Sequence, residues 1–246
     1  MSGIESIVVA TTALPAWKIA GRYRLRGGVG VVRAIARSVP IGRSLAAAAL
    51  AILIGTTTLS ALAGADEISA GASFLEALSI APPTLPVLIV CHGFGCAYRD
   101  TLYLTPAQLN DLRRLLRPAR NAADERKALF KSVAWLDRQM GAVAGTLKRT
   151  PYAALLNTGG GPSQMDCIDL TADITGFLMI LRRLDLLRYH RVGEPVSRGF
   201  LNGGGPHTAP VVVEISSGSQ WVIDSWTRAN GELPETMLAS EWKKRK

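Results

Sequence analysis

The chain has 246 residues, 48% of them hydrophobic, and a net charge of +9. This length and composition are those of a folded protein with one substantial core or two small ones, which excludes a low-complexity, unfolded chain. The charge is concentrated at the ends, because residues 1–44 carry a net +6 and the last four residues +4, leaving −1 for the remainder. Since the body of the chain is nearly neutral and has no basic motif with aromatic support, we expect no nucleic-acid partner.

Residues 44–65 form an uncharged, alanine-rich run that follows a basic region and precedes two acidic residues. A basic flank, an apolar run and a small A-L-A sequence at 61–63 are typical of an export signal with a cleavage site. The run is long enough to stay in place as a membrane anchor, although its threonines and alanines make it weakly hydrophobic and favour cleavage. We therefore expect residues 1–65 to be a basic region with a signal peptide or signal-anchor. The rest of the chain is then exported, to the periplasm in a bacterium, either free or anchored to the inner membrane through 44–65.

The next segments predict a tether and the start of one domain. Residues 66–84 are small, mixed and end in prolines, and we expect a tether there, followed by a domain over 85–246. The apolar run Val87–Val90 predicts a short buried strand. A threonine N-cap followed by proline at 105–106 predicts the start of a helix whose leucines face the core and which ends before Pro118.

The second half of the domain changes from helices to strands. The sequence predicts a helix over 121–146 that is capped near Gly141, and a helix from about Cys167 to Leu187 whose acids come early and whose arginines come late. Strands are predicted at 189–200, 207–216 and 220–226, the last two joined in a hairpin at Ser217-Gly218.

Three cysteines are present: Cys91, Cys96 and Cys167. Glycines at 93 and 95 let the backbone fold back between the first two, and pairing them would leave Cys167 free. All three pairings stay open, as does a chain with unpaired cysteines. A metal site at Cys91, His92 and Cys96 is the weakest interpretation, since no second ligand pair follows at a usual spacing; we expect no metal and no other cofactor.

Cys167 lies where a glycine-rich loop meets the predicted helix, and a helix N-terminus favours the thiolate. Cysteine catalysis also needs a base and a group that orients the base. His207 opens one predicted strand and Asp224 ends its hairpin partner, so both side chains can face that end of the helix. The alternative is that Cys167 only packs in the core, while His207 and Asp224 are ordinary loop and turn residues.

At these residues the chain resembles the transglutaminase-like superfamily, and most closely the bacterial transglutaminase-like cysteine proteinases. The resemblance covers roughly residues 87–242 and is strongest over 164–228. It rests on a cysteine that begins a helix, an acid two residues later, a histidine strand and a W-V-x-D strand, here Cys167, Asp169, His207, Trp221, Val222 and Asp224. The resemblance implies an α+β fold with a papain-like core, in which helices pack on an antiparallel sheet.

The same resemblance implies an exported thiol hydrolase that cleaves peptide or isopeptide amide bonds of a protein or peptide substrate. Cys167 would attack the carbonyl, His207 would transfer the proton, and Asp224 would hold the imidazole. Two alternatives stay open: acyl transfer from glutamine to amines by the same site, and a non-catalytic envelope interaction module with the same fold.

Four further residues of the sequence are expected to affect this site. Gln164 is a candidate second oxyanion donor beside the backbone N–H of Cys167, and Asp169 is a candidate support of the helix start. Asp166 and Asp169 are expected to raise the pKa of the thiol unless they point away or cap the helix. Pro210 interrupts the histidine strand and is expected to disturb it locally.

Overall fold

The computed structural model describes residues 71–154, 161–199 and 205–245. The basic region and the run 44–65 lie outside these residues, and within them no helix is both long and apolar enough to cross a bilayer. The elements in chain order are α2 (Ala72–Ala77), β1 (Val87–His92), β2 (Tyr98–Tyr103), α3 (Pro106–Leu116), α4 (Ala122–Ala144), α6 (Cys167–Arg183), β3 (His190–Arg198), β4 (His207–Glu214), β5 (Gln220–Asp224), β6 (Glu235–Leu238) and α7 (Ala239–Trp242).

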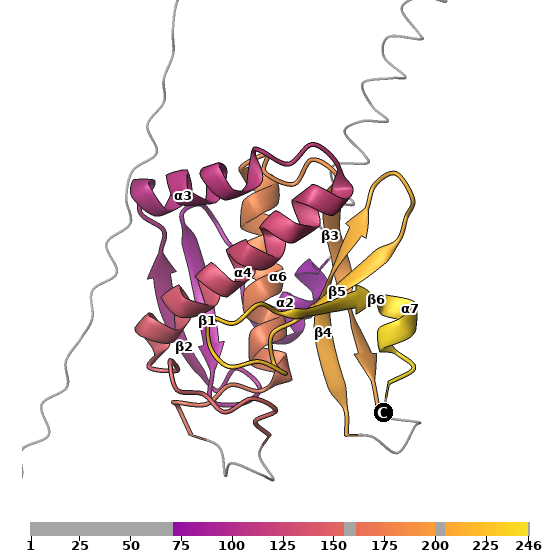
Figure 1. Ribbon diagram of the computed structural model, residues 1–246. Coiled ribbons are helices and arrows are strands. Elements are labelled where there is room, and N and C mark those ends of the chain that lie inside the picture. The colour runs from indigo at the N-terminus through magenta and orange to yellow at the C-terminus, as the bar shows by residue number, and fades with distance from the viewer. Residues whose placement is uncertain (1–70, 155–160, 200–204, 246) are drawn as a thin grey trace, which may run out of the picture. The chain divides into compact units, whose positions relative to one another are not determined.

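The fold is α+β, with α6 between two antiparallel sheets (Figure 1). The strands β1 and β2 form a two-stranded sheet on one side of α6, and β3-β4-β5-β6 form a four-stranded sheet on the other. All residues of α6 from Asp169 to Leu181 are buried, as expected for a helix enclosed on all sides. Gly176 lets β1 approach closely, because a Cβ there would lie 2.8 Å from a methyl carbon of Leu88.

Most of the predicted elements are present, with changes at their ends. Thr105 caps α3 through a complete capping box with Gln108. The helix α4 does not end at Gly141 as predicted: it runs on to Ala144 and is capped by Gly145 in a left-handed conformation (φ 69°). Gly141 instead gives room to Asn230, whose side-chain nitrogen would lie 2.6 Å from an added Cβ.

The tether prediction for 66–84 is wrong for its described part, which begins at residue 71. This part contains α2, whose Leu75 is 2% exposed and belongs to the main core. The Glu194 carboxylate accepts hydrogen bonds from the backbone N–H of Gly71 and the hydroxyl of Ser73, at 3.0 and 3.2 Å. The segment before Pro82 thus forms a short helix that adds to the domain.

The second sheet accommodates Pro210 without breaking β4. The register between β3 and β4 shifts between Gly193 and Val196, so that Pro210 lies opposite a bulge. Pro210 also lies before the residues of β4 that pair with β5, which begin at Val211. The missing N–H of proline is therefore placed where regular pairing is already interrupted.

Candidate active site

Cys167 is the first residue of α6, and the two acids around it form the start of this helix. The side chain of Asp166 is the N-cap and accepts hydrogen bonds from the backbone N–H groups of Ile168 and Asp169, both at 2.9 Å. The Asp169 carboxylate accepts from the Asp166 N–H at 3.0 Å, which completes a capping box. The acids that crowd the thiol are therefore the residues that fix its position at the helix N-terminus.

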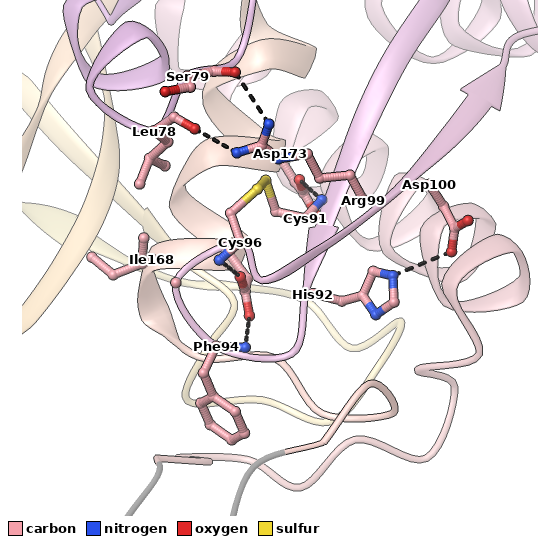
Figure 2. The surroundings of a disulfide bond; sticks show 12 residues. Leu78, Ser79, Cys91, His92, Phe94, Cys96, Arg99, Asp100, Ile168 and Asp173 are labelled. Atoms are coloured by element: carbon pink, nitrogen blue, oxygen red, sulfur yellow. Dashed lines mark hydrogen bonds and ion pairs between the residues drawn. A yellow bond between two sulfur atoms is a disulfide. The ribbon is translucent and has the colours of Figure 1, made fainter. Parts of the chain in front are cut away.

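The loop 93–96 folds over this helix start and donates its N–H groups to the same carboxylates. Phe94 and Cys96 donate to the two oxygens of Asp169 at 2.9 and 2.6 Å (dashed lines from Phe94 and Cys96 in Figure 2). Gly95 donates to Asp166 at 3.0 Å. The φ angles of residues 93–96 are all positive, from 61° to 80°, and successive N–H groups in such a turn point to one side and bind anions. Because two of these four residues are glycines, the conformation is accessible to the chain.

A disulfide between Cys91 and Cys96 closes this loop, with a Cα–Cα distance of 4.5 Å. Of the three pairings that the sequence left open, the structure shows the one in which Cys167 stays a free thiol. Behind the disulfide, the Asp173 carboxylate accepts a hydrogen bond from the Cys91 N–H at 2.7 Å (Figure 2). Burial raises the pKa of Asp173 well above its ordinary value, against the Cys91 N–H that binds it.

His207 and Asp224 form a buried pair at the ends of β4 and β5. The distance from His207 Nε2 to Asp224 Oδ2 is 2.6 Å, and the two side chains are 4% and 2% exposed. The other imidazole nitrogen, Nδ1, is buried and has no hydrogen-bond partner among the described residues. Asp224 therefore orients the ring by one nitrogen, while the second nitrogen makes no hydrogen bond to any described residue, the Cys167 thiol included.

Two tryptophans surround this pair. The ring of Trp226 lies 4.4 Å from the His207 ring, centroid to centroid, and that of Trp242 lies 5.0 Å away. Asp224 Oδ1 accepts the backbone N–H of Trp226 at 3.1 Å, and Oδ2 accepts the indole N–H of Trp242 at 3.2 Å. The carboxylate thus has protein donors on both oxygens, which compensates for its burial.

The thiol lies in the same region as this pair. The backbone N–H of Thr208, the residue after His207, hydrogen-bonds to the Cys167 sulfur, and the negative charge of Asp224 acts on the thiol. Burial raises the pKa of Cys167 to about 11; the Thr208 N–H opposes this rise, while the charges of Asp166 and Asp224 add to it. At neutral pH the thiol is therefore protonated, and it needs a base to become a nucleophile.

Asp166 raises the pKa of the thiol, as expected from the sequence, although it also caps the helix. Asp169 contributes differently: its own pKa is raised to about 7 by burial and by the neighbouring charge of Asp166, against the N–H groups that bind it. Near neutral pH, part of the negative charge expected beside the cysteine is therefore titrated away.

Gln164 is fixed in the loop that leads into α6. Its side-chain oxygen accepts the Thr150 N–H at 2.9 Å, and its backbone carbonyl accepts the Gly93 N–H at 2.8 Å. Because the amide oxygen is bound on one side, the NH₂ end is the part of this side chain that remains to serve as a donor.

The remaining histidines have other roles. His92 joins the β1–β2 sheet to the loop before α6, with Nδ1 2.6 Å from the Pro162 carbonyl and Nε2 3.2 Å from Asp100. His190 is a buried strand residue bound to Glu125 at 2.8 Å. Among the described residues, no group of three or more histidine, cysteine or acidic side chains could hold a metal ion.

The sequence did not indicate three parts of this site. The left-handed loop 93–96 depends on a turn that two glycines suggest but do not specify. The hydrogen bond to the Cys167 sulfur has the backbone N–H of Thr208 as its donor, so no side-chain pattern reveals it. Trp242 lies 18 residues after Asp224 in a short basic tail, and no spacing rule connects the two.

Comparison of the chain with protein-family models, with curated proteins and with solved structures finds no match. The geometry of the described residues is therefore the basis for a functional conclusion.

Proposed function

We propose that this protein is a thiol hydrolase that cleaves peptide or isopeptide amide bonds through an acyl-enzyme on Cys167. One observation carries the proposal: a buried His207–Asp224 pair lies next to a cysteine at a helix N-terminus. The Nδ1 of the imidazole is buried and has no partner among the described residues. The order of helix cysteine, strand histidine and strand aspartate also supports a papain-like core of the transglutaminase-like type.

In the proposed reaction, Nδ1 of His207 accepts the thiol proton as the Cys167 sulfur attacks the amide carbonyl. The carbon–nitrogen bond breaks, the amine leaves with the proton from His207, and a thioester remains on Cys167. Water then gives a proton to His207, attacks the thioester and releases the acid and the free thiol. The thiol pKa of about 11 favours this general-base route over a thiolate formed in advance.

The oxyanion of the tetrahedral intermediate needs donors at the helix start. The backbone N–H of Cys167 and the side-chain NH₂ of Gln164 are the groups that we propose for this role. The bond from Thr150 to Gln164 Oε1 supports this assignment, because it holds the amide in one orientation.

A peptide library digested with the purified chain and analysed by mass spectrometry tests the proposal. We expect new peptide termini with the wild-type chain and none with Cys167→Ala. Cleavage that persists in Cys167→Ala would contradict it. A labelled primary amine in the same reaction separates hydrolysis from acyl transfer, because transfer would leave the label attached to glutamine side chains.

The raised thiol pKa also favours a second candidate, a non-catalytic envelope module that keeps the fold. Two results together would support this candidate. The folded domain would cleave no peptide of the library, and its Cys167 would alkylate no faster after removal of an acid that raises the thiol pKa, such as Asp166. We place export within the same proposal on the basis of the sequence pattern, with the run 44–65 either cleaved as a signal peptide or kept as a membrane anchor.

A further inference from the structure

We propose that Trp242, near the C-terminus, is a positioning residue for the His207–Asp224 pair; the inference rests on the proposed function. Trp242 ends the four-residue helix α7 and is fully buried. Its indole N–H donates to Asp224 Oδ2, the same oxygen that binds His207 Nε2. The C-terminal segment thus completes the surroundings of the proposed catalytic base.

The contact has a defined electrostatic effect. An indole N–H donates and does not titrate, so Trp242 withdraws part of the charge of Asp224 Oδ2 at every pH. His207 must share that oxygen with a second donor: its Nε2 lies 2.6 Å from Asp224 Oδ2, and the indole nitrogen of Trp242 lies 3.2 Å from it. The same indole ring packs 5.0 Å from the imidazole, which keeps water from this side of the pair. Trp242 therefore controls the strength of the hydrogen bond that orients the imidazole and excludes water from it.

The sheet holds Trp242 in place. Arg198, at the end of β3, donates to the Trp242 carbonyl at 3.0 Å, and its guanidinium lies 4.4 Å from the centre of the indole ring. Trp242 also packs in a small second core with valines of β3, β4 and β5. A four-residue helix is not stable alone, so these contacts fix the indole relative to Asp224.

Trp242→Phe tests the inference, because it removes the N–H and keeps an aromatic ring. We expect kcat to fall about tenfold with KM unchanged, the effect of losing one hydrogen bond to a charged group. Independently of any substrate, we expect the low-field proton resonance of the His207–Asp224 bond to move further downfield, since Oδ2 loses its competing donor. The pH profile of Cys167 alkylation should shift as well.

Trp221→Phe is the matched control. Trp221 lies on β5, the strand of Asp224, and its indole N–H is buried without a partner among the described residues, under the guanidinium of Arg126 at 4.1 Å. Trp221→Phe makes the same chemical change as Trp242→Phe, but it should leave Cys167, His207 and Asp224 unaffected. If Trp242→Phe does not fold, a semisynthetic chain with β-(3-benzothienyl)alanine at 242, in which sulfur replaces the N–H, takes its place.

The outcomes separate the two proposals. If the wild-type chain cleaves no peptide, the proposed function fails, while the resonance and the alkylation profile still report on Trp242. A resonance and a profile that match those of wild type and Trp221→Phe would overturn the role of Trp242, whatever the activity.

Discussion

Cys167 combines two opposing influences on one sulfur atom. The helix N-terminus and the Thr208 N–H stabilise a thiolate, while burial and the charges of Asp166 and Asp224 destabilise it. Burial and the two charges outweigh the donors, so that the pKa of the thiol is raised. The residue is thus suited to a reaction in which the proton leaves only as the sulfur attacks. This makes the histidine essential to the proposed chemistry.

The raised pKa of Cys167 predicts how stability depends on pH. A thiol whose pKa is higher in the folded state, here about 11 against about 8.5 for a free cysteine, stabilises the fold below the lower value and loses this contribution as pH rises through the higher one. We expect the free energy of unfolding of the wild-type chain to fall more steeply above pH 8.5 than that of Cys167→Ala. Denaturant titrations between pH 7 and 11 measure this; parallel curves would show that the thiol titrates normally.

Asp224 allows charge and geometry to be separated. Asp224→Asn keeps an oxygen that can accept from His207 Nε2 but removes the negative charge, whereas Asp224→Ala removes both. We expect kcat to fall about tenfold in Asp224→Asn and about a hundredfold in Asp224→Ala. Steady-state kinetics on a peptide identified from the library give both values, and equal activity in all three proteins would remove Asp224 from the mechanism.

Among the elements, the loop 93–96 and the start of α6 depend on one another. The loop gives its N–H groups to Asp166 and Asp169, and the disulfide keeps the loop in the conformation that does so. Closing a loop this short restricts the unfolded chain modestly, by about 2 kcal/mol.

We therefore expect the double variant Cys91→Ser, Cys96→Ser to lose about 2 kcal/mol of stability, and to exchange the amide protons of the first turn of α6 faster than wild type. Hydrogen exchange followed by mass spectrometry measures the second effect. The sheet β3-β4-β5-β6 serves as the internal control, since it does not contact the loop through these bonds. Unchanged protection at 166–170 would show that the loop does not hold the helix.

The sequence predicted those elements whose signals are local. A threonine N-cap before proline specified α3, and a long apolar helix with acids first and arginines last specified α6. It could not specify β2 or β6, because their side chains are mostly half-buried or exposed and show no regular alternation. The end of α4 was misplaced because Gly141 and Gly145 are equal candidates locally, and only the contact of Asn230 with Gly141 distinguishes them.

In the candidate site, too, local signals could be predicted from the sequence and tertiary contacts could not. Cys167, His207 and Asp224 could be found from the order of a helix cysteine and two strand residues. The disulfide could only be ranked among three pairings, and the role of Trp242 required the tertiary contact itself.

At the scale of the whole molecule, one buried ion pair connects the helices with the segment after β5 that carries Trp226. Arg149 binds both oxygens of Asp137 in α4 at 2.8 and 2.9 Å and donates to the carbonyl oxygens of Ser225 and Arg228. Both side chains are at most 2% exposed. The pair therefore joins parts of the chain that lie more than 70 residues apart.

Arg149→Met should lower the free energy of unfolding by about 3–5 kcal/mol, because it leaves the Asp137 carboxylate buried without its partner. The double variant Asp137→Leu, Arg149→Met should regain part of that loss, since no unpaired charge remains. Urea unfolding followed by fluorescence measures both. The Gly231 N–H also donates to Asp137 Oδ2 at 2.7 Å. A double variant less stable than Arg149→Met would mean that this contact of Asp137 with the segment, and not the charge pair, holds these parts together.

The proposed chemistry depends most on the cooperation of Cys167 and His207, and one measurement tests it directly. With Cys91 and Cys96 paired, Cys167 is the single free thiol of a three-cysteine chain, so its alkylation by iodoacetamide can be followed across pH without interference. We predict that at pH 7 the wild-type chain reacts faster than His207→Ala, because the imidazole takes the thiol proton, and that the rate in His207→Ala rises only toward pH 11. Superimposable profiles for the two proteins would contradict the account.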